Sequence, residues 1–148
     1  MPFAETRLLT TVGAKIMMEA AIGQAEKFSI AVTVVVVDAG GHTILLERMD
    51  GGRFHTVYSS TTKAVCAASN RRPTTTRGAQ AQELDTLHAL GLSLAAGPQR
   101  WTAIEGGFPI FIESQCVGGI GVSGGDWKQD EEIARAAVEA VGANIGDA

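Results

Sequence analysis

Residues 31–49 read AVTVVVVDAGGHTILLERM, and they give the strongest indication of the fold. Its first seven residues are apolar or β-branched, which is typical of a central strand buried on both faces. Residues 38–41 (DAGG) favour a turn, and residues 42–49 then return beside the first strand. The stretch therefore predicts an antiparallel β-hairpin.

Helices are expected on both sides of this hairpin. Apolar side chains recur at spacings of three and four within residues 5–27, which predicts a helix with one buried face. That face consists of Leu9, Val12, Ile16 and Ala20. A second helix is predicted over residues 54–70, because Gly51-Gly52 precedes it and Pro73 prevents its continuation.

The rest of the chain predicts a third helix, a second hairpin and a final helix. The third helix covers residues 80–92, and its apolar side consists of Leu84, Leu87, Leu90 and Leu92. Residues 101–104 are expected to form a short strand. Residues 110–113 and 116–122 flank a turn and predict the second hairpin.

The final helix is predicted to begin near Trp127, with Asp126 as its N-cap and Gln129 as the capping-box partner. Its buried stripe consists of Ile133, Ala134, Ala137, Val138 and Val141. Hairpins with helices outside the pairing predict an α+β domain, an antiparallel sheet with helices packed on it. Few strand–helix–strand crossovers are present, which disfavours a dinucleotide-binding fold.

Composition narrows the possible partners. The 148 residues fit one domain, 1–148, and the net charge of −4 without a basic block disfavours nucleic acid. The apolar run 30–37 is too short to span a membrane. The first residues do not resemble a signal peptide, so we expect a cytoplasmic protein with free thiols at Cys66 and Cys116.

Glycine is over-represented: 18 of the 148 residues are glycine, about 12% against a usual share near 7%, and eleven of the 18 lie in five clusters. Glycine pairs permit positive φ and close approach of the backbone to another group. Besides making turns, these clusters suggest a backbone-lined pocket or a tight contact between subunits.

Several motifs together resemble the GlcG/HbpS family of small heme-binding-type proteins. They recur in family order and at family spacing between about residues 5 and 145. The matching segments are VDAGG (37–41), ERMDG (47–51), TKA (62–64) with Ala67, IEGGFP (104–109), VGGIGVSG (117–124), Asp130 and Ile133-Ala134. The chain also resembles the C-terminal domain of PduO-type corrinoid adenosyltransferases.

This resemblance implies a profilin-like fold with a five-stranded antiparallel sheet flanked by helices, and homo-oligomers. It also implies binding of heme or a corrinoid, while other members accompany catabolic enzymes. In heme-binding members a histidine on the first helix can ligate the iron. This chain departs from that pattern, because no histidine precedes His42.

A stripe on the second helix carries the main candidates for chemistry. His55, Ser59, Lys63 and Cys66 are spaced four, four and three, which places them within an arc of roughly 80° on one helix face. Such a stripe predicts a pocket wall with His55 as acid or base, Lys63 as anion partner and Cys66 as a soft thiol. The alternative is a solvated helix face. The resemblance favours the pocket, because the lysine matches the family motif.

Two further sets complete the candidate site. Arg48 and Asp50 flank Met49 at a strand end, which places both side chains on one face of the strand. They are expected either to form a structural ion pair or to bind a ligand carboxylate through Arg48, with Asp50 orienting the arginine. Gly106, Gly107 and Gly121 are candidates to present backbone N–H groups to an anion, with turn formation as the alternative. The three histidines have no metal-type spacing, so no metal site is predicted.

Two functions from different classes remain open. The first is a binding module for a flat, partly apolar, anionic ligand, with heme or a related tetrapyrrole favoured by the resemblance and His55 or His88 as the iron ligand. The second is a cofactor-free lyase, isomerase or hydratase in which Lys63, Arg48, Asp50 and His55 supply acid, base and anion binding.

Assembly into a closed homo-oligomer, a dimer or an even multiple, is also predicted. The chain is small, its charge is only modestly negative, and Gly118, Gly119 and Gly121 permit close approach of backbones.

Overall fold

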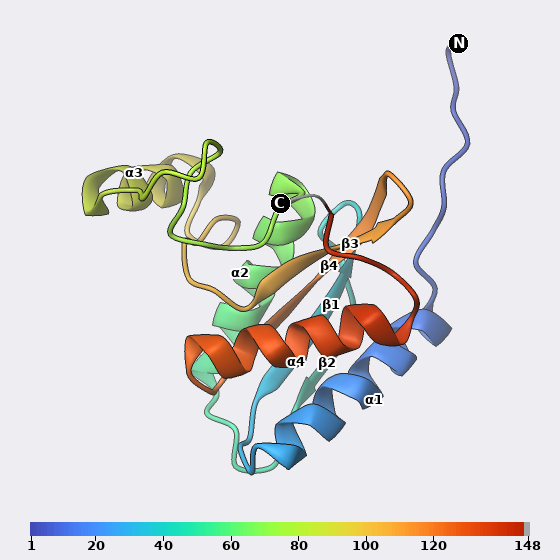
Figure 1. The fold of residues 1–148 in the computed structure, drawn as a ribbon, viewed down its shortest axis with the longest axis vertical. Coiled ribbons are helices and arrows are strands. Elements are labelled where there is room, and N and C mark those ends of the chain that lie inside the picture. The colour runs from blue at the N-terminus through green and yellow to red at the C-terminus, as the bar shows by residue number, and fades with distance from the viewer. Residues whose placement is uncertain (147–148) are drawn as a thin grey trace.

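The computed structural model describes residues 1–146, and in this part of the chain four strands and four helices form one sheet with helices on both faces (Figure 1). Their order is α1 (Thr11–Lys27), β1 (Thr33–Asp38), β2 (Thr43–Arg48), α2 (His55–Asn70), α3 (Thr86–Ala96), β3 (Gly107–Ile112), β4 (Gln115–Ser123) and α4 (Trp127–Ala140).

Both predicted hairpins are confirmed. The sheet has the order β2-β1-β4-β3, and every neighbouring pair is antiparallel. β1 pairs with β2 and β4, and five of its six residues are buried. The sequence 31–37 therefore lies at the centre of the sheet, as its β-branched composition predicts.

The expectation of five strands is wrong for residues 1–146, which contain four. At the outer edge of β3, isolated backbone hydrogen bonds replace a fifth strand. Asn144 exchanges two backbone hydrogen bonds with Phe111, and Thr74 donates its N–H to the Gly107 carbonyl at 2.9 Å. Residues 101–104, expected as a short strand, have no strand conformation.

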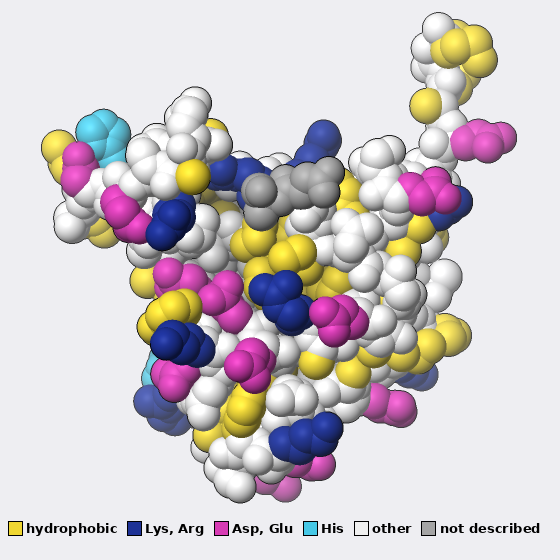
Figure 2. Space-filling model, viewed as in Figure 1, with side chains coloured by type: hydrophobic (Ala, Val, Ile, Leu, Met, Phe, Trp, Pro, Cys, Tyr) yellow, Lys and Arg dark blue, Asp and Glu magenta, His cyan; other side chains and the backbone are white. Residues whose placement is uncertain are grey.

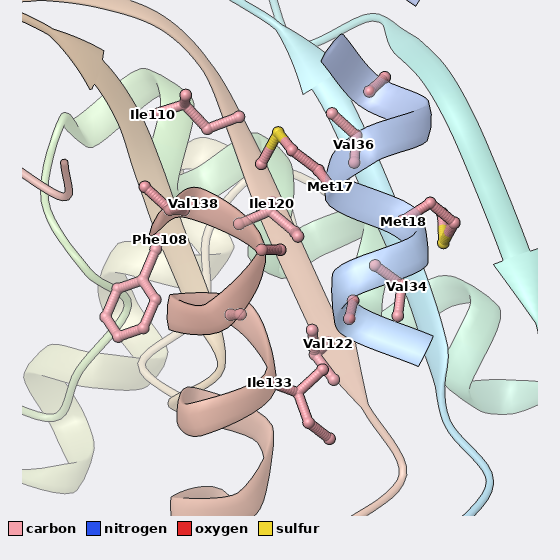
Figure 3. Packing of buried hydrophobic residues seen from close by; sticks show 14 of the residues in the cluster. Met17, Met18, Val34, Val36, Phe108, Ile110, Ile120, Val122, Ile133 and Val138 are labelled. Atoms are coloured by element: carbon pink, nitrogen blue, oxygen red, sulfur yellow. The ribbon is translucent and has the colours of Figure 1, made fainter. Parts of the chain in front are cut away.

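Helices α1 and α4 cover one face of the sheet, and α2 covers the other (Figure 1). The larger core lies under α1 and α4. Figure 3 shows Met17 of α1 and Val138 of α4 directed toward Ile120 on the sheet. The smaller core lies under α2, where Val35 and Val37 contact alanines of the helix.

The face that α1 buries differs from the predicted one. Val12 and Ile16 are 69% and 45% exposed, whereas the buried side consists of Ala14, Met17, Met18, Ala21 and Ala25. Small alanines on this side let α1 pack closely against α4, whose buried stripe also contains alanines. The helix begins at Thr11 and not at residue 5, because the Thr10 side chain accepts the Gly13 N–H and caps it.

The final helix matches its prediction. Asp126 caps α4, its side chain accepts the Gln129 N–H at 2.8 Å, and the Gln129 side chain accepts the Asp126 N–H at 3.0 Å. The predicted stripe is buried apart from Val141, which is half-buried against the same core.

Helix α3 projects from the body of the molecule as an arm (Figure 1). It begins at Thr86, after the N-cap Asp85, and not at residue 80. None of its residues is buried, so its predicted apolar side is exposed: Leu87 is 78% and Leu90 is 58% accessible. Figure 2 shows this arm standing off the rest of the surface.

Among the described residues, no helix combines the length and the apolar character needed to cross a membrane.

Candidate functional site

A cavity of about 490 Å³ lies at one end of the sheet, between α2, the β4–α4 turn and the segment that follows α3. Its wall combines cationic, hydroxyl-bearing and aromatic side chains. The lining residues that matter below are Arg53, His55, Ser59, Lys63, Trp101, Glu105, Ser123, Trp127 and Asp130.

The floor of this cavity contains a buried ion pair. Lys63 Nζ donates to the Val122 carbonyl at 2.7 Å and lies 3.3 Å from Asp130 Oδ2, and each residue is 4% exposed. The other oxygen of Asp130 accepts the Gly125 N–H at 2.9 Å. These bonds connect α2, the end of β4 and the start of α4.

Burial changes the acidity of both partners. Desolvation lowers the pKa of Lys63, against the opposing effects of Asp130 and Glu105. Desolvation also raises the pKa of Asp130, against the opposing effect of Lys63. The two pKa values therefore move toward one another, and both groups lie in the cavity wall.

The three glycines predicted to bind an anion lie outside the cavity lining and permit close packing. Gly106 has φ +115°, and a Cβ there would lie 2.9 Å from Lys63 Nζ. A Cβ at Gly107 would press on the Lys63 carbonyl, and one at Gly121 would collide with the Ser60 carbonyl. The absence of side chains at these glycines therefore allows α2 to pack closely against the sheet.

Two more residues of the predicted stripe line the cavity with Lys63. His55 is the first residue of α2 and is exposed, and its ring has no hydrogen-bond partner among residues 1–146. Ser59 lies one turn further along, and its hydroxyl donates to the His55 carbonyl at 3.4 Å.

Cys66, the fourth member of the stripe, does not line the cavity. It is 2% exposed, its thiol lies 3.6 Å from the Thr102 carbonyl, and burial raises its pKa. The environment therefore stabilises the thiol over the nucleophilic thiolate.

Arg48 and Asp50 are also apart from the cavity. Both are exposed near the end of β2, the edge strand, and no ion pair joins them in the described part of the chain. The alternative of a structural ion pair between them is therefore wrong, and the structure brings neither residue to the cavity.

Sequence reasoning missed several residues of the cavity. Trp101 and Trp127, the two tryptophans of the chain, both line it, and so do Arg53 and Ser123. Asp130 matches the family motif, but its position in the sequence predicts no role for it. The tryptophans come from segments far apart in the sequence, so no local pattern joins them.

Together, the fold and the cavity define a small α+β domain of the ligand-binding class. The chain belongs to the HbpS-like family, because the family model described as "Haem degrading protein HbpS-like" matches residues 9–139. Protein GlcG of Escherichia coli K12 is 32% identical over 100 residues, which is 68% of this chain and 69% of GlcG.

Solved structures agree with this assignment. Protein ORFY of Klebsiella pneumoniae is 32% identical with a TM-score of 0.82, covering 96% of this chain and 97% of ORFY. Streptomyces reticuli HbpS, in a double-mutant form, is 31% identical with a TM-score of 0.77, covering 93% and 90% of the two chains. A PduOC:heme complex shares the fold at 23% identity and a TM-score of 0.81, covering 95% of this chain and all of PduOC.

The corrinoid adenosyltransferase PduO of Salmonella typhimurium is 27% identical over 130 residues. That match covers 88% of this chain and 37% of PduO.

Proposed function

We propose that the cavity binds a flat, partly apolar ligand with an acidic group, with heme or a related tetrapyrrole as the favoured ligand. The observation that carries the proposal is the position of His55, whose imidazole has no hydrogen-bond partner among residues 1–146 and lines the same cavity as both tryptophans. Neutral imidazole is a common axial ligand of heme iron, and aromatic side chains pack against flat rings.

The residues of the cavity fit such a group. Arg53 offers a planar cation for a ligand carboxylate, and no carboxylate pairs with it among residues 1–146. Family membership supports the same ligand class, as do the heme in the PduOC structure and the family's description as heme-degrading. His88 is less suited, because its ring bonds Asp85 at 2.9 Å on the arm and does not line the cavity.

Titration with hemin tests the proposal. We expect a Soret band that titrates to one hemin per chain and shifts or weakens in His55→Ala. His88→Ala is the matched control and should behave as the unchanged protein. A Soret spectrum that both variants leave unchanged would exclude these histidines as the iron ligand and contradict this mode of binding.

The Lys63–Asp130 pair favours a second candidate function, a cofactor-free lyase, isomerase or hydratase. Paired groups whose pKa values converge are suited to moving a proton at a substrate carbon. The test is exchange of the methyl protons of pyruvate in D₂O, followed by NMR. Acceleration that the Lys63→Met variant lacks would support this class, and no acceleration over buffer would count against proton abstraction from keto acids.

We also propose that the protein assembles into a homo-oligomer of even subunit number. The glycines of β4 do not supply the contact, because α2 packs on Gly119 and Gly121 while Val37 and Leu9 lie against Gly118. The exposed arm is the better candidate. An isolated helix of 11 residues is marginally stable in water, so its exposed leucines favour packing against a second subunit.

A further inference from the structure

The Ser123 hydroxyl at the end of β4 is buried without a hydrogen-bond partner among residues 1–146. Ser123 is 4% exposed and lines the cavity. It lies on the α2 face of the sheet, because Gly119 and Gly121 face α2 and side chains alternate along a strand. An unpaired hydroxyl at such a place is unfavourable unless another group bonds to it.

Neighbouring hydroxyl groups on the same side of the sheet form hydrogen bonds with other groups of the protein. Thr33 and Thr56 share a hydrogen bond of 2.8 Å, and the Ser60 hydroxyl donates to the Thr56 carbonyl at 2.6 Å. Ser123 differs from them in having its hydroxyl unpaired where the cavity reaches the sheet.

Lys63 provides a second donor at the same place. An ammonium group has three N–H bonds, and the described structure uses two of them, to Val122 and to Asp130. Val122 is the residue next to Ser123, and both Lys63 and Ser123 line the cavity. One ammonium N–H and one hydroxyl beside the cavity floor are therefore without a partner among residues 1–146.

The charge around these donors selects the kind of acceptor. Asp130 already balances the charge of Lys63, and Glu105 adds a second carboxylate to the lining. A ligand carboxylate at the floor would lie close to both acidic groups beside a buried ion pair, where like charges repel more strongly than in bulk water. An uncharged carbonyl oxygen accepts the same two hydrogen bonds without that cost.

We propose that Lys63 and Ser123 form a subsite for an uncharged carbonyl oxygen of the ligand. The inference rests on the proposed function and deepens it, because it assigns the acidic group of the ligand to Arg53 and a carbonyl to the floor. Ligands of this class are flat carbonyl compounds, such as an aryl ketone, a cyclic amide or a tetrapyrrole that carries a ring carbonyl.

The test uses three aromatic probes of similar size: acetophenone, benzoate and ethylbenzene. Binding is followed through the two tryptophan indole N–H signals in ¹H–¹⁵N NMR, which report on this cavity because both tryptophans line it. We expect acetophenone to bind more tightly than ethylbenzene. Ser123→Ala should weaken acetophenone about fivefold to tenfold, as expected for one hydrogen bond, and leave ethylbenzene unchanged.

Matched variants separate this role from folding. Ser69→Ala, at an exposed serine near the end of α2, should change neither binding nor stability. Ser123→Ala should keep or raise the Tm of the free protein, because it removes an unpaired hydroxyl. A lowered Tm would assign the hydroxyl a structural bond and overturn the proposal. Lys63→Met combined with Asp130→Leu tests the ammonium without leaving a buried charge, and it too should weaken acetophenone.

The outcomes distinguish this subsite from the proposed heme function. Acetophenone binding that depends on Ser123, in a protein that does not bind hemin, would support the subsite and reject heme. Hemin binding through His55, with acetophenone unaffected by Ser123→Ala, would overturn the subsite alone. A Ser123 effect confined to benzoate would also overturn the proposal, because the floor would then select a carboxylate.

Discussion

Lys63 on α2 and Asp130 on α4 form a buried ion pair, with Nζ 3.3 Å from Oδ2 and both side chains almost inaccessible. We expect Lys63→Ala to lower the free energy of unfolding by about 3–5 kcal/mol, because it leaves the Asp130 charge buried and unpaired. Lys63→Met combined with Asp130→Leu should stay within about 1–2 kcal/mol of the unchanged protein. Urea unfolding of the three proteins measures both differences, and equal losses in both variants would contradict this account.

Close packing of α2 on the sheet depends on the absence of a side chain at Gly121. A Cβ there would collide with the Ser60 carbonyl and lie 2.6 Å from the Ala64 nitrogen. Gly121→Ala should therefore cost about 2 kcal/mol or more in the free energy of unfolding. Gly23→Ala is the control, because a Cβ at this α1 position meets nothing within 4 Å and should stabilise by about 0.5–1 kcal/mol. Similar effects at the two sites would disprove the packing argument.

The Cys66 thiol should resist alkylation in the folded protein. It is 2% exposed, whereas Cys116 is half-buried. At pH 8, iodoacetamide should label Cys116 before Cys66, as mass spectrometry of the digested protein can establish. Faster labelling of Cys66 would contradict this prediction and show that the chain around Thr102, which contacts the thiol, moves away from α2 readily.

Deprotonation of the Cys66 thiol should also make the free energy of unfolding depend on pH. Burial raises its pKa above the ordinary value of 9.0, so the folded state holds the thiol proton more tightly than the unfolded chain. Its contribution to stability is fully present below pH 9.0 and is lost as pH rises through the folded pKa. Chemical unfolding between pH 7 and 11 should therefore show a smaller loss of stability in Cys66→Ala than in the unchanged protein. Parallel curves for the two proteins would contradict this assignment.

Assembly can be tested at the arm. We expect the protein to elute as a homo-oligomer, and light scattering should give an even multiple of 15.4 kDa. Leu90→Glu with Leu94→Glu places charges on the exposed face of α3 and should shift the mass toward the monomer. Val12→Glu, at an equally exposed site on α1, is the control. A monomer at micromolar concentration before any substitution would refute the assembly prediction.

Local sequence determined much of the fold. The β-branched run 31–37 specifies a buried strand because its side chains suit a pleated surface covered on both faces. Asp126 and Gln129 specify the start of α4 because the capping bonds form between residues three apart. His55, Ser59 and Lys63 reach one cavity for the same reason, since helical spacing alone places them on one face.

Which faces of the helices pack together depends on contacts that form only in the folded molecule. Helix α1 has two apolar sides. The side with Ala14 and Met17 is buried by packing against α4 and the sheet, whereas Val12 on the other side is exposed. The cavity depends equally on distant segments: Trp101 follows the arm, Ser123 ends β4 and Asp130 lies on α4. The hydrogen bonds that cap a helix and the helical period act over a few residues, so the local sequence predicts them directly. Burial and the pairing of charges depend on contacts between residues far apart in the chain, which arise only when the sheet and its helices come together.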